Sequence, residues 1–325
     1  MGNRLLDVID LKAYFITQRS VVKAVDGVSF HVDENETLGI VGESGCGKTV
    51  TSLAVLRLLP RPAGNIVGGQ ILFDGLDMVK ATDKQLQKIR GGKISMILQD
   101  PMASLNPVFN IGNQIGEAIT AQTKITGSNL ILKVIDMLKR VKIPSPEARI
   151  RDYPHQMSGG MKQRVVGAIS ISCHPRLLIA DEPTTSLDVT IQAQYLQLLK
   201  DLQSEFGMSL IFITHDFGIV ASMCDRVAVM YAGKIVETAP VRDIFFRPAH
   251  PYTVALLKAV PKLETDTDRL VSIKGQPPRL DKVPEGCSFS PRCSQAADGC
   301  RREMPPLVEI GRDHFARCWQ SQGRK

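Results

Sequence analysis

The sequence contains no run of about 18 consecutive apolar residues, the length that a membrane-spanning helix requires. Its first residues, MGNRLLDVIDLKAYF, do not have the form of a secretory signal peptide. Internal repeats and low-complexity tracts are also absent, which excludes repeat architectures. The first two absences predict an intracellular protein that does not itself cross a membrane.

Length and charge set broader limits. The 325 residues exceed an average domain, so we expect a core domain with an extension. The formal net charge is +7, but 40 basic residues are scattered among 33 acidic ones, and we therefore expect no nucleic-acid partner.

Short β-branched and apolar runs alternate with longer helical patterns. The runs Thr37–Val41, 177–180 and 210–214 each end in polar residues, which favours an α/β fold with a mainly parallel sheet. Residues 129–141 place apolar side chains at helical spacing and predict a separate helical subdomain. After about Pro240, frequent prolines disfavour long regular elements.

A glycine-rich segment with the pattern GxxxxGK[ST] follows the first of these runs and opens a helical pattern. Glycines let the backbone wrap around phosphates, while successive N–H groups and the helix N-terminus hold the anion. We expect Lys48 to reach the terminal phosphates and Thr49 to bind magnesium. The predicted nucleotide-binding residues of this phosphate loop are Gly42, Ser44, Gly45, Cys46, Gly47, Lys48, Thr49 and Val50.

The apolar run 177–180 continues into two carboxylates, Asp181 and Glu182. One carboxylate can bind magnesium, directly or through water, and the other can polarise the water that attacks a phosphate. We assign these roles to Asp181 and Glu182 respectively. Many strands end in an acidic loop, so the assignment depends on the motifs around it.

These motifs, taken in order, resemble the ATP-binding cassette (ABC) family over roughly residues 4–240. The segment SGGMKQR (158–164) is similar to the family signature, residues 186–188 to its D-loop, and His215 to its switch histidine. Gln99 resembles the Q-loop glutamine, and Phe15, next to Tyr14, takes the place of an aromatic that stacks on adenine.

The resemblance implies an ATPase with ATP and Mg²⁺ as cofactors. Its implied catalytic residues are Lys48, Gln99, Glu182 and His215, and its implied magnesium ligands are Thr49, Gln99 and Asp181. In this family two cassettes sandwich two ATP molecules, so Ser158, Gly159 and Gly160 would bind the ATP of a second cassette, either an identical chain or a paralogue. The helical region would receive a short helix from a membrane subunit.

Several segments sharpen the resemblance towards oligopeptide and dipeptide importer ATPases: QDPMASLNPV (99–108), YPHQMSGGMKQR (153–164), ADEPTTSLDVTIQAQ (180–194) and HPYTVALLKAVP (250–261). This likeness implies two membrane permease subunits, indirect work with an extracytoplasmic substrate-binding protein, and a peripheral place on the cytoplasmic face of the inner membrane. An importer for nickel or another small solute is the alternative. A non-transport ABC mechanoenzyme is disfavoured because the chain has no second cassette or coiled-coil insertion.

Four of the seven cysteines crowd the last part of the chain: Cys287, Cys293, Cys300 and Cys318. Their spacing is not that of common zinc ribbons, and it leaves zinc, a [4Fe–4S] cluster and unmodified thiols open. The resemblance favours the cluster, with zinc as the alternative and His314 as a substitute ligand. Arg292, Arg301 and Arg317 would then offset the charge of the cluster.

The implied architecture is an α/β RecA-like phosphate-loop ATPase core with an antiparallel β subdomain, a helical subdomain and a metal-binding C-terminal extension. We place the cassette at residues 1–240, its helical subdomain at about 105–165, and the extension, called the tail below, at 241–325.

Overall fold

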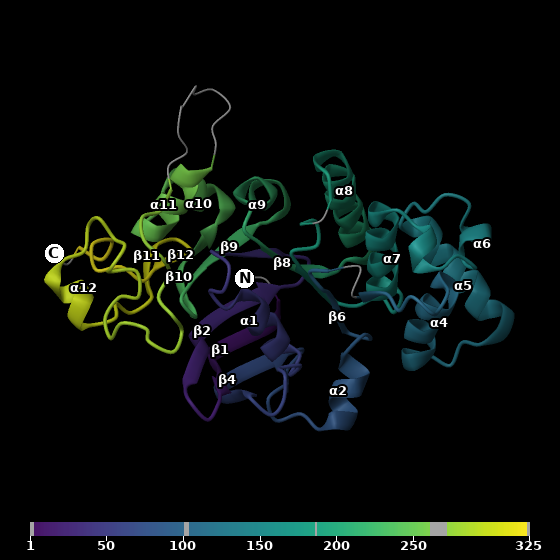
Figure 1. Cartoon of the computed structure of the whole chain (residues 1–325), viewed down its shortest axis with the longest axis horizontal. Helices are drawn as coiled ribbons and strands as arrows, with labels where there is room; N and C mark the ends of the chain where they lie inside the picture. The colour runs from purple at the N-terminus through teal and green to yellow at the C-terminus, as the bar shows by residue number, and fades with distance from the viewer. Residues whose placement is uncertain (1–2, 101–103, 186, 261–271, 324–325) are drawn as a thin grey trace. The chain divides into compact units, whose positions relative to one another are not determined.

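The computed structural model of the protein describes residues 3–100, 104–185, 187–260 and 272–323. Ser186 of the predicted D-loop and parts of the segments 99–108 and 250–261 lie outside these ranges. The chain, whose helices and strands are labelled in Figure 1, divides into two compact units that are each assembled from separate segments. We call residues 33–36 and 80–212 the carboxylate unit, and residues 4–32, 37–79 and 213 onward the phosphate-loop unit.

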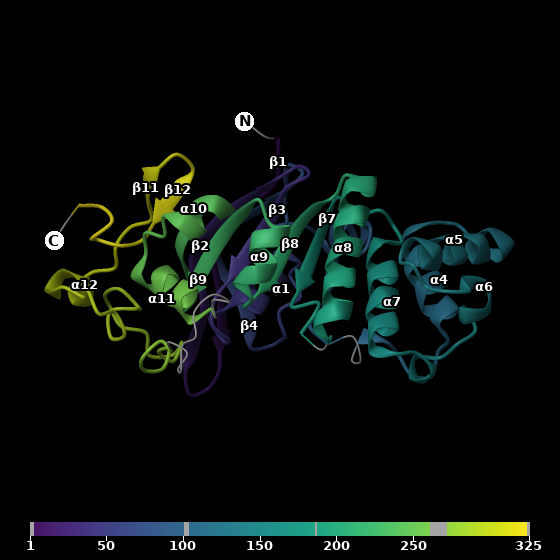
Figure 2. The same cartoon turned by 90° about the horizontal axis from the view of Figure 1, so that it is seen from above.

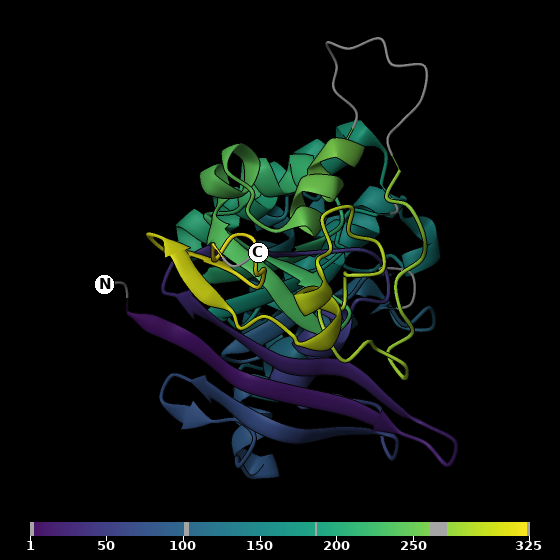
Figure 3. The same ribbon diagram turned by 90° about the vertical axis from the view of Figure 1, so that its left-hand side faces the viewer.

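The phosphate-loop unit contains a four-stranded antiparallel sheet in the order β2-β1-β4-β5, seen from its side in Figure 3. Leu6 and Val8 are buried in β1, and after a register shift between Ile9 and Lys12 burial passes to Leu11 and Ala13. A bulge of this kind restores the inward face when the alternation changes by one residue. The strands are β1 (Arg4–Ile16), β2 (Val21–Asp33), β4 (Gly64–Phe73) and β5 (Leu76–Asp77).

The same unit carries five strands of a second sheet in the order β11-β12-β10-β9-β3. All five residues of β3 are buried, as expected for a strand covered on both faces, and β3 runs parallel to β9. The run Thr37–Val41 predicted from the sequence is this strand. The remaining strands pair antiparallel: β9 (Arg226–Tyr231), β10 (Lys234–Pro240), β11 (Val308–Gly311) and β12 (His314–Ala316).

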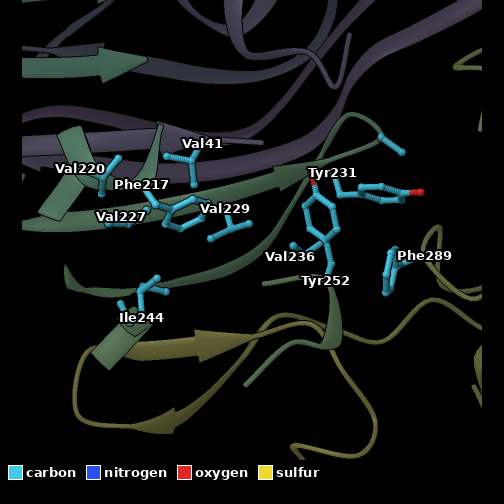
Figure 4. Close-up of a cluster of buried hydrophobic side chains, with 12 residues drawn as sticks. Val41, Phe217, Val220, Val227, Val229, Tyr231, Val236, Ile244, Tyr252 and Phe289 are labelled. Carbon is cyan, nitrogen blue, oxygen red and sulfur yellow. The ribbon is translucent and has the colours of Figure 1, made fainter. Parts of the chain in front are cut away.

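Helices and a shared apolar cluster complete the phosphate-loop unit. Val41, Val229, Tyr231, Tyr252 and Phe289 are members of this cluster (Figure 4), so the tail shares a core with the strands around the phosphate loop. Among the described residues of the tail, the longest helix has nine residues, in agreement with the proline-rich sequence. The helices are α1 (Lys48–Val55), α9 (Phe217–Met223), α10 (Val241–Phe246), α11 (Pro251–Ala259) and α12 (Asp298–Arg302).

The carboxylate unit contains parallel strands β6 and β7, the first part of β8, and most of the long helices. Residues 129–141, predicted to be helical, lie almost wholly in α5, which packs with α4, α6 and α7 (Figure 2). The strands are β6 (Ile94–Ile97), β7 (Leu177–Asp181) and β8 (Ser209–Thr214). The helices are α2 (Asp83–Ile89), α4 (Ile111–Gln122), α5 (Gly127–Arg140), α6 (Pro146–Arg149), the 3₁₀ turn η1 (Pro154–Gln156), α7 (Gly159–Ile171) and α8 (Val189–Phe206).

None of the helices in the described ranges combines the length and the apolar character needed to cross a membrane.

Candidate nucleotide site

The phosphate loop connects β3 to α1 and needs glycine at two points. A Cβ atom on Gly42 would lie 2.2 Å from the carbonyl oxygen of Met230, and one on Gly47 would lie 2.2 Å from that of Ala24. Gly47 also has φ of 108° and immediately precedes the helix. Close backbone approach and left-handed geometry together explain why the sequence places glycine at both positions.

The side chain of Lys48 folds back over the phosphate loop. It is buried, and its Nζ donates to the carbonyl oxygens of Gly42 at 2.7 Å and Glu43 at 3.1 Å. Thr49 is exposed on the first turn of α1. The loop therefore presents a lysine charge, a helix N-terminus and an accessible hydroxyl, the groups that hold phosphate and magnesium in this motif.

Cys46 belongs to the same loop but is 5% exposed. Burial raises the pKa of the Cys46 thiol, with the nearby Lys48 charge acting in the opposite direction. The thiol is neutral and packed, so Cys46 contributes volume to the loop rather than a reactive group.

In the carboxylate unit, Asp181 ends β7 with 1% exposure, and Glu182 follows with φ of 45°. A positive φ is uncommon for a residue with a side chain and often marks a functional turn. Gln99 Nε2 donates to Glu182 Oε2 at 3.1 Å, and Thr185 Oγ1 donates to the same oxygen at 3.1 Å. Two donors on one oxygen fix the orientation of this carboxylate.

Thr185 was not among the residues singled out from the sequence. The signal was available, because a hydroxyl three residues after a turn carboxylate is within reach of it in DEPTT.

The signature segment begins α7, as its sequence predicts. Ser158 is the N-cap residue, and its Oγ accepts from the N–H of Met161 at 3.3 Å. Ser158 and Gly159 are exposed, whereas a Cβ on Gly160 would lie 2.8 Å from Ile191 Cγ2. The segment thus offers the N-terminus of a 13-residue helix to a ligand from outside the chain.

The remaining predicted site residues lie in the phosphate-loop unit. His215 is exposed directly after β8, and Phe15 is half-buried near the end of β1. The hydroxyl of neighbouring Tyr14 donates to Asp26 Oδ1 at 2.6 Å, and Asp26 also pairs with Lys234. Tyr14 therefore has a structural task, and Phe15 is the aromatic left for a base.

Two family models match the chain. Residues 25–185 match the ABC transporter model, and residues 236–300 match the model described as the C-terminal region of oligopeptide/dipeptide transporters. A probable peptide ABC transporter ATP-binding protein, y4tR of Sinorhizobium fredii, is 50% identical over 98% of this chain and 95% of its own length. The chain belongs to the ABC transporter family. This cassette is an ATPase, and ATP with Mg²⁺ is its expected cofactor pair.

Other relatives agree with this family. The oligopeptide transport protein OppD of Bacillus subtilis is 49% identical over 97% of this chain and 88% of its own length. The dipeptide transport protein DppD of the same organism is 47% identical over 99% and 96%. Both are named as ATP-binding proteins.

Solved cassettes share the α/β fold with its phosphate-loop core. The dimeric, post-hydrolysis structure of the cassette MJ0796 with ADP and Pi is 23% identical, with a TM-score of 0.65 over 73% of this chain and 99% of that one. CbiO1 of Clostridium perfringens, part of an ABC transporter complex, is 26% identical, with a TM-score of 0.63 over 76% and 92%.

The prediction of an iron–sulfur cluster, and of metal binding in the tail, is wrong. Within the described ranges, no group of three or more His, Cys, Asp or Glu side chains is arranged to hold a metal ion. Cys287, Cys293, Cys300 and Cys318 are all free of disulfides and line one cavity. That cavity measures about 20 Å³.

The chemistry of these side chains also departs from the prediction. Burial raises the pKa of Cys287 to about 11 and also raises that of Cys293. His314, the alternative ligand, is buried with Nε2 at 2.8 Å from Glu237 Oε1. Arg292, expected to offset the charge of a cluster, instead pairs with Glu43.

Proposed function

We propose that this ABC cassette hydrolyses ATP to drive uptake of dipeptides and oligopeptides through two membrane permease subunits, from the cytoplasmic face of the membrane. One observation carries the proposal: relatives named for peptide transport align with nearly the whole chain, tail included. The match of residues 236–300 to a region described for oligopeptide/dipeptide transporters supports the same substrate class.

The residues present fit ATP and magnesium. Gly42 and Gly47 leave no space for a side chain at the two points where the loop lies against neighbouring backbone, and Lys48 donates to carbonyl oxygens within the loop. We infer that the loop N–H groups and Lys48 hold the phosphates and that Phe15 stacks on the base. Thr49, Gln99 and Asp181 would hold Mg²⁺, which when bound supplies positive charge to neutralise the phosphates.

Glu182 is the proposed general base. Its Oε2 accepts hydrogen bonds from Gln99 and Thr185, so the carboxylate is held in one orientation for a water proton. His215 is proposed to stabilise the transferring phosphoryl group, because its side chain is exposed directly after β8.

The exposed signature supports a site completed by a second cassette, identical or paralogous. Ser158, Gly159 and Gly160 would add a helix N-terminus to the ATP held by the partner. Removal of the γ-phosphate contact by hydrolysis would then let the two cassettes separate, which is a ligand-driven shift between two states.

A groove in the carboxylate unit supports the permease contact. It measures about 450 Å³ and lies between α4, α5 and the turn after α6. Gly112 and Gly116, which have no side chains, and the apolar residues Leu130 and Ile131 line this groove. Ile131 and the nearby Phe109 are 52% and 48% exposed, so apolar surface is available to a short helix.

The experiment is peptide uptake into vesicles that contain the cassette, its partner cassette and the permeases, supplied with the substrate-binding protein. We expect ATP-dependent uptake of a labelled tripeptide, and none when every cassette copy of this chain carries Glu182→Gln. Uptake of nickel without peptide uptake would instead support the small-solute alternative, and hydrolysis with no uptake of either would overturn the importer assignment.

A further inference from the structure

The tail reaches back to the phosphate loop within the phosphate-loop unit. Arg292, which lies 249 residues after Glu43, donates from one terminal nitrogen to Glu43 Oε2 at 2.6 Å and from the other to Oε1 at 2.9 Å. Its Nε donates to the carbonyl oxygen of Lys274 at 3.0 Å. A guanidinium paired through both nitrogens with both carboxylate oxygens is a geometrically specific contact.

This ion pair is largely withdrawn from water. The side chain of Arg292 is 4% exposed and that of Glu43 is 26% exposed. Arg292 also lies against the rings of Tyr231 and Phe289, with centroid distances of 5.8 and 5.9 Å. The charge on Glu43 therefore depends on Arg292 for its compensation, because solvent reaches it only in part.

A second tail residue holds the backbone of the same loop. Tyr252 Oη accepts from the N–H of Glu43 at 2.9 Å. Tyr252 packs against Tyr231 and Phe289, with ring centroids 4.5 and 5.3 Å apart (Figure 4). The rigid aromatic group thus fixes one peptide unit of the loop from the side of the tail.

Glu43 belongs to the phosphate loop, so its negative charge affects the binding of a phosphate there. Its carbonyl oxygen accepts from Lys48 Nζ, the group proposed to reach the phosphates. An uncompensated carboxylate on the phosphate loop would repel a polyphosphate, whereas a neutralised one would not. Neither the phosphate-loop pattern nor the cysteine pattern of the sequence predicts the ion pair between Glu43 and Arg292.

We propose that Arg292 is a positioning residue for nucleotide binding, which neutralises Glu43 and ties the phosphate loop to the tail so that the loop can accept ATP. The inference rests on the proposed binding of ATP by this loop. It makes the tail a determinant of ATP affinity, and it assigns a task to a residue that touches no phosphate itself.

The test is ATP affinity of the purified full-length chain with Mg²⁺, measured for Arg292→Ala, Glu43→Gln and the double variant. Arg292→Ala should weaken binding about tenfold or more, because one partner of a buried pair is left charged. Glu43→Gln should strengthen binding a few-fold, since Arg292 then adds positive charge near the phosphates. The double variant should return to within about threefold of the parent chain.

A merely structural pair would not give effects of opposite sign. If both single variants weakened binding and the double variant were no better than Arg292→Ala, the proposal would be overturned. Circular dichroism and melting temperature check that each variant folds, and Arg292→Lys, which keeps the charge but loses the fork, should lie between parent and Arg292→Ala. The matched control is exposed Arg301→Ala, which should bind ATP as the parent does.

Two further readouts separate this proposal from the proposed function. The deficit of Arg292→Ala should shrink at high salt, because screening weakens the repulsion from Glu43. Hydrolysis by Arg292→Ala in the assembled transporter should show a raised KM for ATP with kcat within about twofold. Failure of both the parent chain and Lys48→Ala to bind ATP would overturn the nucleotide site itself, whereas binding by the parent alone leaves the Arg292 test intact.

Discussion

The phosphate loop and the four-cysteine part of the tail lie in the same unit and were both interpreted from sequence patterns, but only the loop has the structure that its pattern predicts. The loop follows a buried strand, requires glycine at two close approaches and opens a helix. The four thiols line a cavity of about 20 Å³ and do not form a metal site.

The difference teaches what kind of pattern carries a site. A phosphate loop acts mainly through its backbone, so local sequence fixes most of its geometry. A metal site requires side chains from distant segments to meet at bond distance as thiolates, and spacing alone does not determine this. In the tail, organisation comes from buried hydrogen bonds and strand pairing instead.

The strongest way to sharpen the comparison is to remove the reacting carboxylate of the cassette. Glu182→Gln should lower kcat about a thousandfold, because a general base contributes on that scale, while ATP affinity stays near the parent value. ATP turnover of the assembled transporter and nucleotide retention on the same sample measure both. Unchanged turnover would remove Glu182 from the role of general base.

The second prediction concerns Glu237, which is fully buried on β10, shortly before the tail begins, and which hydrogen-bonds to residues of the tail. Its carboxylate accepts from the N–H groups of Ala249 at 2.7 Å and His250 at 2.9 Å and contacts His314. Glu237→Ala should lower the free energy of unfolding by about 3 kcal/mol, since it leaves buried donors unsatisfied.

Urea denaturation of Glu237→Ala beside exposed Glu309→Ala provides the matched comparison. A loss no larger than that of Glu309→Ala would show that Glu237 does not organise the tail.

A smaller effect on the free energy of unfolding is expected when the pH is lowered. Burial lowers the pKa of His250 from 6.5 to about 4, and the Glu237 charge opposes this shift. Below pH 6.5 the unfolded chain binds a proton at His250 that the folded chain does not bind. The folded state is therefore fully stabilised by this group above pH 6.5 and loses the stabilisation as pH falls towards 4. At pH 5 the loss in the free energy of unfolding is about 2 kcal/mol.

His250→Asn keeps a side-chain acceptor for the N–H of Tyr252 and removes this titration. The difference in unfolding free energy between pH 7 and pH 5 should therefore be smaller in the variant, as urea titrations at both pH values would measure. Equal pH dependence in both chains would contradict the assignment.

The smallest expected effect concerns Thr185. Thr185→Ala removes one of two donors to Glu182 Oε2 and should lower kcat about fivefold, the equivalent of one ordinary hydrogen bond, with ATP affinity unchanged. Thr185→Ser, which keeps the hydroxyl, should retain most of the rate. A kcat for Thr185→Ala equal to the parent would show that Gln99 alone orients the carboxylate.

Local order in the sequence predicts much of the fold. The run 37–41 is β3, 177–180 lies within β7 and 210–214 within β8, because short buried strands have a composition of their own. The contact of Arg292 with Glu43 was not predictable, since only folding brings together residues 249 positions apart. The arrangement of the four tail cysteines was not predictable for the same reason, because whether distant side chains meet in a metal site depends on the tertiary structure.

The central claim is that the loop after β3 holds ATP, and calorimetric titration of the purified chain with Mg²⁺ and ATP tests it most directly. We expect saturable binding by the parent chain and by exposed Lys124→Ala, and a loss of about a hundredfold or more in affinity for Lys48→Ala, which removes a charge held within the loop. Equal affinity in Lys48→Ala and the parent chain would contradict the account.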